Sequence, residues 1–262
     1  MRVPSAAKRP LEGRGIVVTR PALQGARLSG LIESAGGRPI AFPAIEIRDV
    51  EDPTAVNALI DRLPLFHAAI FISPNAANKA MRAITARRAL PADLHLIAIG
   101  SGSARELRRH GVAQVIVPGR YDSESLLDLP ALHDVAGKRI AIFRGEGGRA
   151  LLGDALSARG AAVEYAECYR RVRPALDAAP LIAAWSRGQI DAVVATSSEG
   201  LRNVCEMLGP AGRQWLAGTA LFVPHARIAA TARELGLTSV VLTDSGDEAM
   251  AAAMARHFEG TA

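Results

Sequence analysis

Short apolar runs alternate with longer helical patterns along most of the chain. The candidate strands, mostly unbroken runs of Ile, Val, Leu and Ala, are 15–19, 69–73, 94–99, 114–117, 139–143, 191–196, 219–223 and 239–242. Strands without polar alternation are typical of a parallel sheet that is covered on both faces. Strand and helix in alternation therefore predict a doubly wound α/β fold with right-handed connections.

The segments between these strands carry ordinary helix signals. Ser73-Pro74-Asn75 predicts the start of a helix over 76–87, and Ser123 and Ser197-Ser198-Glu199 predict two further helix starts. Glycine occupies the position where a left-handed cap is expected at the ends of three other helices, at Gly111, Gly160 and Gly236.

The whole pattern occurs twice. The segment from Lys138 to Arg171 repeats the segment from Arg14 to Ile47 about 124 residues later, as strand, basic residue, helix, glycine turn and second strand. An internal repeat of this length indicates two similar α/β domains and not a solenoid. Small-molecule sites tend to lie between domains, so a cleft between the two is the first place to expect a ligand.

Two long extended stretches, 38–48 and 161–173, occupy equivalent places in the two repeats. We interpret them as a pair of strands that run between the domains as a hinge, which makes the first domain discontinuous. The predicted fold is thus two similar parallel-sheet, flavodoxin-like domains joined by a two-strand hinge. The expected parts are a disordered basic tail at 1–13, a first domain at 14–38 plus 172–260, a second domain at 46–164, and hinge strands at 39–45 and 165–171.

Composition and charge exclude several classes of protein. With 49% hydrophobic and 22% charged residues, the 262-residue chain can fill the cores of two ordinary domains. No apolar run reaches the roughly 18 residues of a membrane span, and the first residues lack the apolar segment of a secretory signal. We therefore expect no membrane partner and a cytoplasmic location.

The formal net charge of +5 does not indicate a nucleic-acid partner. The N-terminal tail supplies +3 of it, from Arg2, Lys8, Arg9 and Arg14 against Glu12. The rest of the chain is nearly balanced and has no basic stripe of the kind that nucleic-acid-binding proteins carry.

Cofactor motifs are missing or incomplete. The two cysteines, Cys168 and Cys205, stand far apart, and the six histidines show no metal-ligand spacing. Gly100-Ser101-Gly102-Ser103 resembles half of a dinucleotide fingerprint, but Arg105 stands where the third glycine belongs. We therefore expect no metal, nucleotide or other cofactor.

Hydroxyl side chains and arginines recur at the carboxyl ends of the predicted strands. Open α/β sheets bind ligands at this edge, and the free N–H groups of a helix N-terminus bind anions. Simple helix capping is the alternative for each Ser or Thr alone, but recurrence in both repeats favours a ligand with several acidic groups. The candidate binding residues are Thr19, Arg20, Ser73, Asn75, Ser101, Arg144, Thr196, Ser197 and His225. Tyr169, on the second hinge strand, can project into the cleft or lie half-buried as an ordinary strand aromatic.

A series of short motifs follows the strands along the chain: Val18-Thr19-Arg20-Pro21, Phe42-Pro43 with Ile45-Glu46-Ile47, Phe71 with Ser73-Pro74-Asn75-Ala76, Ala98-Ile99-Gly100 with Ala104, Phe143-Arg144-Gly145 with Gly148-Arg149, Tyr169-Arg170-Arg171, Thr196-Ser197 with Glu199-Gly200-Leu201, and Arg227-Ile228-Ala229. Taken in this order, the motifs resemble those of the uroporphyrinogen-III synthase family. Two departures are Ser103, where the family often has Thr, and Pro224-His225, where Ser-His or Ser-x is common.

The resemblance implies a cofactor-free lyase of heme and tetrapyrrole biosynthesis. Its substrate would be hydroxymethylbilane, a linear tetrapyrrole polycarboxylate, which the family dehydrates and cyclises to uroporphyrinogen III with inversion of the last pyrrole ring. It matches Tyr169 to the family's candidate proton donor, and it adds Ser103, Arg149 and Arg227 to the expected binding residues. It also implies a monomer, with the preceding pathway enzyme as a partner.

Two other functions stay open at this point. A hinged two-domain small-molecule binding protein without catalysis would share the repeats and the cleft, but it would normally carry an export signal. A nucleotide-dependent enzyme is disfavoured by the broken glycine pattern.

Overall fold

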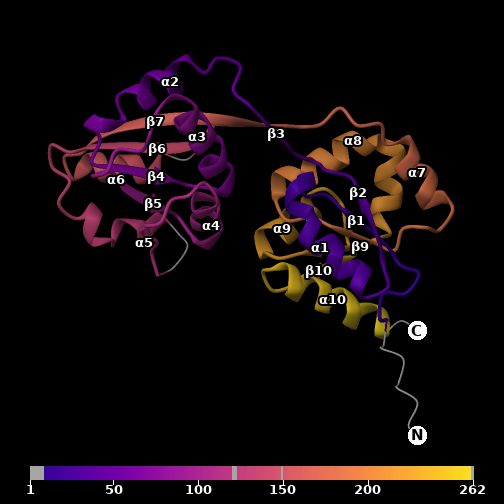
Figure 1. Ribbon diagram of the computed structural model, residues 1–262. Helices are drawn as coiled ribbons and strands as arrows, with labels where there is room; N and C mark the ends of the chain where they lie inside the picture. The colour runs from indigo at the N-terminus through magenta and orange to yellow at the C-terminus, as the bar shows by residue number, and fades with distance from the viewer. Residues whose placement is uncertain (1–8, 120–122, 149, 261–262) are drawn as a thin grey trace, which may run out of the picture. The chain divides into compact units, whose positions relative to one another are not determined.

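The computed structural model describes residues 9–119, 123–148 and 150–260 (Figure 1). The chain divides into two compact units, which we call unit 1 and unit 2. Unit 1 takes the chain up to Glu46 and again from Val172 onward, and unit 2 is Ile47–Arg171. The chain passes from one unit to the other within β3 (Glu46–Arg48) and within β7 (Ala162–Val172).

The core of unit 1 is a five-stranded parallel sheet in the order β10-β9-β8-β1-β2. Numbered along unit 1 this order is 2-1-3-4-5, the flavodoxin order. Its strands are β1 (Gly15–Val18), β2 (Arg38–Ala41), β8 (Ala192–Val194), β9 (Ala220–Val223) and β10 (Val240–Leu242). Its helices are α1 (Ala22–Ser34), α7 (Ala179–Ser186), α8 (Ser198–Ala217), α9 (Ala226–Glu234) and α10 (Asp247–Glu259).

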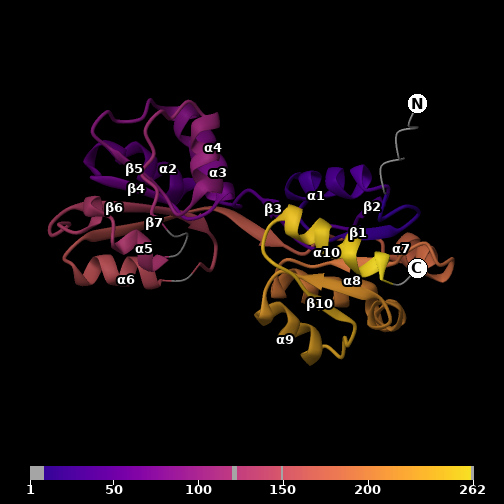
Figure 2. The same ribbon diagram turned by 90° about the horizontal axis from the view of Figure 1, so that it is seen from below.

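Alternate residues of each strand in unit 1 enter two separate cores. Ile16 and Val18 pack with α1 and α10 on one face of the sheet, whereas Val17 and Val193 pack with α7, α8 and α9 on the other (Figure 2). Both faces of the sheet are buried, which explains why the strand sequences are unbroken apolar runs.

Unit 2 has the same design. Its sheet has the order β3-β7-β6-β4-β5, and β4 to β7 are parallel. The remaining strands are β4 (Ala68–Phe71), β5 (His95–Ala98) and β6 (Arg139–Gly145). The helices are α2 (Thr54–Asp61), α3 (Pro74–Arg87), α4 (Ser101–Arg109), α5 (Ser123–Leu127) and α6 (Leu151–Ala158), with 3-10 turns at Leu63–Leu65 and Pro130–Leu132. Helices α2, α3 and α4 cover one face, and α5 and α6 cover the other (Figure 2).

The sequence repeat is also a repeat of topology. The run β9-β8-β1-β2 of unit 1 corresponds to β5-β4-β6-β7 of unit 2. The predicted strand 114–117 is reduced to one parallel bridge between Ile97 and Ile116, at the place that β10 takes in unit 1. The predicted fold class is confirmed: two parallel-sheet α/β units, the first of them discontinuous.

Three expectations about the chain's connecting segments are refined. The expected disorder of 1–13 is wrong for residues 9–13, because Leu11 is fully buried against α1 and its N–H donates to the carbonyl of Ala35 at 3.0 Å. Within the two stretches read as hinge strands, 39–41 belong to β2, which pairs with β1. The other stretch, 165–171, belongs to β7, which pairs with β6 as far as Tyr169.

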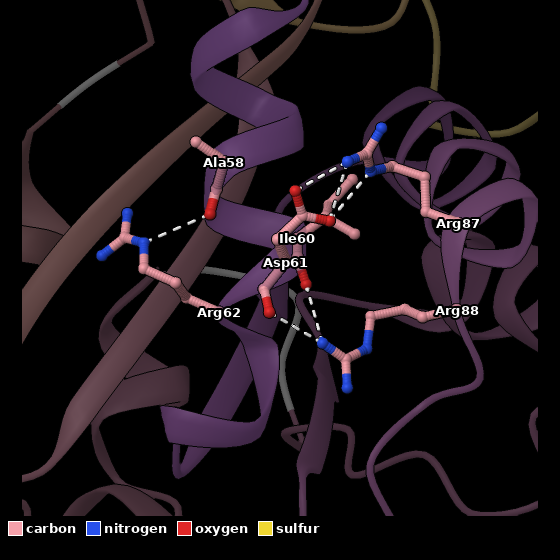
Figure 3. A network of polar contacts seen from close by, with 6 residues as sticks. All are labelled: Ala58, Ile60, Asp61, Arg62, Arg87 and Arg88. Carbon is pink, nitrogen blue, oxygen red and sulfur yellow. Dashed lines mark hydrogen bonds and ion pairs between the residues drawn. The ribbon is translucent and has the colours of Figure 1, made fainter.

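Arginine side chains form hydrogen bonds at the carboxyl end of α2 (Figure 3). Arg88 donates to the Asp61 carbonyl at 2.8 Å, and Arg62 donates to the Ala58 carbonyl at 3.2 Å. Arg87 donates to both carboxylate oxygens of Asp61 and thereby lowers the pKa of that carboxyl. The arginines thus satisfy carbonyls that the helix end leaves unpaired, and they tie α2 to the end of α3.

Glu164 links β7 to β6 and α2, because it accepts hydrogen bonds from Arg139 at 2.6 Å and from Arg62 at 2.8 Å. Burial raises the pKa of Glu164, but these two hydrogen bonds outweigh it, so the pKa is lowered overall. A carboxyl with a lowered folded pKa stabilises the fold above its unfolded pKa, and this contribution is lost as the pH falls through the folded pKa.

Glu164→Gln is therefore expected to flatten the acid-side fall in the free energy of unfolding between about pH 5 and pH 3. Urea denaturation at several pH values measures it. The matched control is Glu33→Gln, on the exposed side of α1. Equal slopes for Glu164→Gln and wild type would contradict the assignment.

Candidate active site

A hollow opens at the carboxyl edge of the unit 2 sheet. From β4 the chain moves to β5 on one side, and it later returns to β6 on the other side, so β4 and β6 flank the topological switch point. Ligands of open α/β sheets bind outside the strand ends at such points. The hollow has a volume of about 240 Å³, and its lining includes Ser73, Gly145, Leu151, Tyr165, Tyr169 and Arg171. We call it the Tyr169 hollow.

Tyr169 reaches the hollow by way of a β-bulge. In the pairing of β6 with β7, Arg144 lies opposite Glu167, but the next residue, Gly145, lies opposite Tyr169, so Cys168 is an extra residue. A bulge re-aims the side chain that follows it. The Tyr169 side chain is largely buried, at 5% exposure, while it still borders the hollow.

The phenol of Tyr169 is held by the start of α3. Its oxygen lies 3.1 Å from Oγ of Ser73. Ser73 is the N-cap of α3, and its Oγ accepts the N–H of Ala76 at 3.0 Å. Ser73 therefore both caps α3, as the sequence predicted, and lies beside Tyr169 at the hollow.

The Tyr169 ring lies directly against Gly145. A Cβ at this position would come within 2.6 Å of Cζ and 2.7 Å of Cε2 of Tyr169. The Tyr169 ring can therefore occupy this position only when residue 145 has no side chain. The neighbouring Cys168 is buried, and its thiol donates to the Arg144 carbonyl. Burial raises the pKa of Cys168 to about 12, which keeps it a structural thiol and not a nucleophile.

Arg144 is engaged within unit 2. Its side chain is 13% exposed. Its Nε and Nη2 donate to Glu167 Oε1 at 3.2 and 2.9 Å, its Nη1 donates to the Gly148 carbonyl at 3.0 Å, and its guanidinium lies 3.9 Å from the centre of the Tyr165 ring. The arginine that we expected as an anion ligand therefore braces the end of β6, beside a second hollow of about 520 Å³ that Glu167 also lines.

The other candidates of unit 2 differ in access. Ser101, the first residue of α4, is exposed, and Asn75, in the first turn of α3, is half-buried. Ser103 is 1% exposed, and within the described residues its hydroxyl has no hydrogen-bond partner. Its burial excludes direct contact with a ligand in this conformation. Arg149 lies outside the described residues.

In unit 1, the predicted residues follow neighbouring strands. Thr19 follows β1, Thr196 follows β8, and His225 follows β9, which places all three at one edge of the sheet. His225 and Arg227 are exposed at the start of α9, and Thr196 is half-buried. This edge therefore carries polar groups next to the N-termini of α8 and α9.

Three of the unit 1 candidates have internal partners. Thr19 is 4% exposed and donates to the Val194 carbonyl at 2.8 Å. Arg20 pairs with Asp247 at 2.5 Å. Ser197 caps α8 and accepts the N–H of Gly200 at 3.0 Å. Ser73 and Ser197 both cap a helix, which is the alternative that the sequence left open for the hydroxyl residues.

Several residues of the hollow were not among the predicted ones. Arg171 lies two positions after Tyr169 on the same strand, so the period of two could have indicated it. Tyr165 lies before the bulge at Cys168 and packs on the other face of the sheet, so alternation from Tyr169 could not have indicated it. Gly145 is a glycine at a strand end, which is a sign of a bulge or a close approach.

The part of the chain that the structure describes shows neither a metal-binding cluster nor a membrane-spanning helix. Within that part of the chain, no three or more His, Cys, Asp or Glu side chains are grouped so as to hold a metal ion. No helix in the same part is long and apolar enough to cross a membrane.

Comparison with known proteins places the chain in a family. The family model described as uroporphyrinogen-III synthase HemD matches residues 26–252. The uroporphyrinogen-III synthase of Escherichia coli K12 is 33% identical over 235 residues, which cover 88% of this chain and 96% of that protein. The enzyme of the same name from Salmonella typhimurium LT2 is 35% identical over 239 residues, with the same two coverages.

Solved structures agree on the fold. A uroporphyrinogen III synthase variant from Thermus thermophilus superposes with a TM-score of 0.60 at 22% identity, covering 94% of this chain and 98% of that chain. The uroporphyrinogen-III synthetase of Helicobacter pylori 26695 gives 0.55 at 15% identity, covering 95% and 100%. The match over residues 26–252 and the relatives above 30% identity show the relationship directly: this chain belongs to the uroporphyrinogen-III synthase family.

Proposed function

We propose that this chain is a uroporphyrinogen-III synthase, a lyase that dehydrates and cyclises hydroxymethylbilane in heme biosynthesis without a cofactor. The observation that supports this most strongly is the family match over residues 26–252. We further propose that the enzyme works as a monomer in the cytoplasm and receives its substrate from the preceding pathway enzyme.

The size of the Tyr169 hollow suits one part of such a substrate. Its volume of about 240 Å³ is below the roughly 300–1,000 Å³ of pockets that hold a whole small-molecule ligand, so we assign it to a single pyrrole ring. Ile72, Ile142 and Leu151 offer apolar contacts to the faces of the ring. Arg171, on the same lining, suits a carboxylate side chain of that ring.

In this proposal Tyr169 is the proton donor to the departing hydroxyl. The C–O bond of the terminal hydroxymethyl group breaks, the phenol O–H supplies the proton, and water leaves. The pyrrole nitrogen drives this departure with its electron pair, so the acid has only a modest task. The larger task is to hold a flexible chain so that the substituted carbon of the last ring is attacked, for which positioning can supply very large effective molarities.

The remaining carboxylates of the substrate need anion sites elsewhere. We assign them to the strand ends where helices begin, and the accessible candidates there are Ser101 in unit 2 and Thr196, His225 and Arg227 in unit 1. Helices α4 and α9 begin without a side-chain cap, which suits the binding of an anion by their first N–H groups. Arg20 and Arg144 are weaker candidates, because each already holds a carboxylate of the protein.

The deciding experiment is incubation with freshly generated hydroxymethylbilane, followed by oxidation and chromatographic separation of the porphyrin isomers. We expect mainly the type III isomer, formed faster than the ring closure in buffer. Type I product at the buffer rate would contradict the proposal. Tight binding of the substrate without turnover would instead support the binding-protein alternative.

Activity is expected to survive a chelator and exhaustive dialysis. The proposed chemistry needs only a proton donor and a positioning surface, so no metal, nucleotide or flavin enters it. The measurement is the rate of type III formation before and after treatment. Restoration of a lost rate by any added cofactor would contradict the cofactor-free assignment.

A further inference from the structure

Two residues position the Tyr169 side chain, and neither of them is itself an acid at neutral pH. Gly145 leaves the space that the ring occupies, since a Cβ there would lie 2.6 Å from Cζ. Ser73 lies 3.1 Å from the phenol oxygen. Tyr169 itself belongs to β7, and the two contacts come from two other elements, β6 and the start of α3, so the phenol position is fixed from two sides.

The direction of the hydrogen bond between Ser73 and Tyr169 decides where the phenol proton points. Oγ of Ser73 accepts the N–H of Ala76 at 3.0 Å, which leaves the Ser73 O–H available to donate. When Ser73 donates, the phenol O–H does not point at Ser73 and is free to point into the Tyr169 hollow. The same donor then stabilises negative charge on the phenol oxygen as its proton leaves.

We propose that Ser73 and Gly145 are the positioning residues of Tyr169: Ser73 donates to the phenol oxygen and so presents the phenol proton to the hollow, and Gly145 provides the space for the ring. The inference rests on the proposed function, because it names how the proton donor of that reaction is set. It gives Ser73 a role through Tyr169, in addition to the direct substrate contact that the sequence predicts.

A serine of the same kind in unit 1 gives a matched comparison. Ser197 caps α8 as Ser73 caps α3, with the same 3.0 Å bond from the third helical N–H. Unit 1, to which Ser197 belongs, contains no tyrosine, whereas Ser73 has the phenol of Tyr169 beside it in unit 2. Loss of the cap is therefore common to both alanine variants, and loss of the donor to Tyr169 belongs to Ser73→Ala alone.

The first test is spectroscopic and does not depend on catalysis. The chain has three tyrosines, so labelling the tyrosine Cζ with carbon-13 gives three resonances, and Tyr169→Phe identifies the one required. We expect Ser73→Ala and Gly145→Ala to move the Tyr169 resonance, and Ser197→Ala to leave it in place. Gly30→Ala is the control for the glycine change, because a Cβ on Gly30 meets nothing within 4 Å.

The second test uses the rate of type III formation. Ser73→Ala is expected to lower kcat roughly tenfold with little change in KM, the loss of about one hydrogen bond in the transition state. Ser73→Thr keeps the hydroxyl and should restore kcat. Ser73→Asp still caps the helix but cannot donate, so it should keep the stability and not the rate.

A double mutant tests whether Gly145 acts through Tyr169. Gly145→Ala should lower kcat by displacing the ring, and adding Tyr169→Phe should lower it no further, because both changes remove one function. Gly30→Ala should leave kcat at the wild-type value.

The two proposals can fail separately. Type I product alone from the wild-type chain would overturn the proposed function, and the Tyr169 resonance would still decide whether Ser73 and Gly145 set the phenol. If the wild type is active and Ser73→Ala matches it in kcat, the positioning role of Ser73 is overturned. An unmoved Tyr169 resonance in both variants would overturn the inference as a whole.

Discussion

Tyr169→Phe is expected to lower kcat about tenfold, which is less than the roughly 10²–10⁴ that general acid catalysis contributes elsewhere. The smaller figure follows from the substrate, because the pyrrole electrons already drive the departure of the hydroxyl. Backbone N–H groups or water can also supply the proton in the variant. We expect the type III isomer to remain the main product, since positioning depends on the whole site and not on one phenol.

The assay measures kcat, KM and the isomer ratio together. A wild-type kcat in Tyr169→Phe would eliminate the acid role. A switch to mainly type I product would show instead that Tyr169 holds the last ring in its inverted pose. Because the substitution also removes the partner of Ser73, urea denaturation should accompany the kinetics and is expected to show a loss of about 1 kcal/mol.

The elements that the sequence predicted well are those specified locally. Strands such as 139–143 are apolar on both faces. This requirement shows in consecutive residues, so it can be recognised without knowing which strands lie beside them. The start of α3 at Ser73-Pro74 is also local, because the cap bond spans only three residues. The repeat strengthened each of these predictions by presenting the same pattern twice.

The features that the sequence could not predict depend on contacts between distant segments. Leu11 looked like part of a tail, because its burial comes from packing against α1 and not from any periodic pattern. Arg144 looked like a free anion ligand, because its partner Glu167 lies on another strand, 23 residues later. The position of Tyr169 depends on the bulge that follows this pair. A bulge shifts every later pairing by one residue, and nothing in the alternation of this strand marks its position.

The site shows the same division. The carboxyl ends of the strands were predictable as the place of the candidates, since parallel strands share that edge. Which candidate is accessible was not predictable. Ser101 and Ser103 are two residues apart on one helix, yet the first is exposed and the second is 1% exposed.

Arg144→Glu is expected to destabilise unit 2 by about 2 kcal/mol, a larger effect on folding than on substrate binding. The change removes the hydrogen bonds to Glu167 and Gly148 and the contact with the Tyr165 ring. It also places a second carboxylate beside Glu167. The Arg144 side chain is only 13% exposed, so water screens this repulsion poorly, whereas Glu167 is 39% exposed, which keeps the figure below that of a fully buried pair.

Urea denaturation measures the expected loss, with separate probes for the two units because a two-unit chain need not unfold in one step. Arg144→Met is the matched variant: it keeps much of the aliphatic length and removes the charge, so it should cost less than Arg144→Glu. Exchanging the charges, as Arg144→Glu with Glu167→Arg, should recover part of the stability, since the pair is re-formed with reversed sign. An Arg144→Glu chain that unfolds like wild type but has a raised KM would contradict the bracing role and would return Arg144 to the anion-binding role that the sequence first suggested.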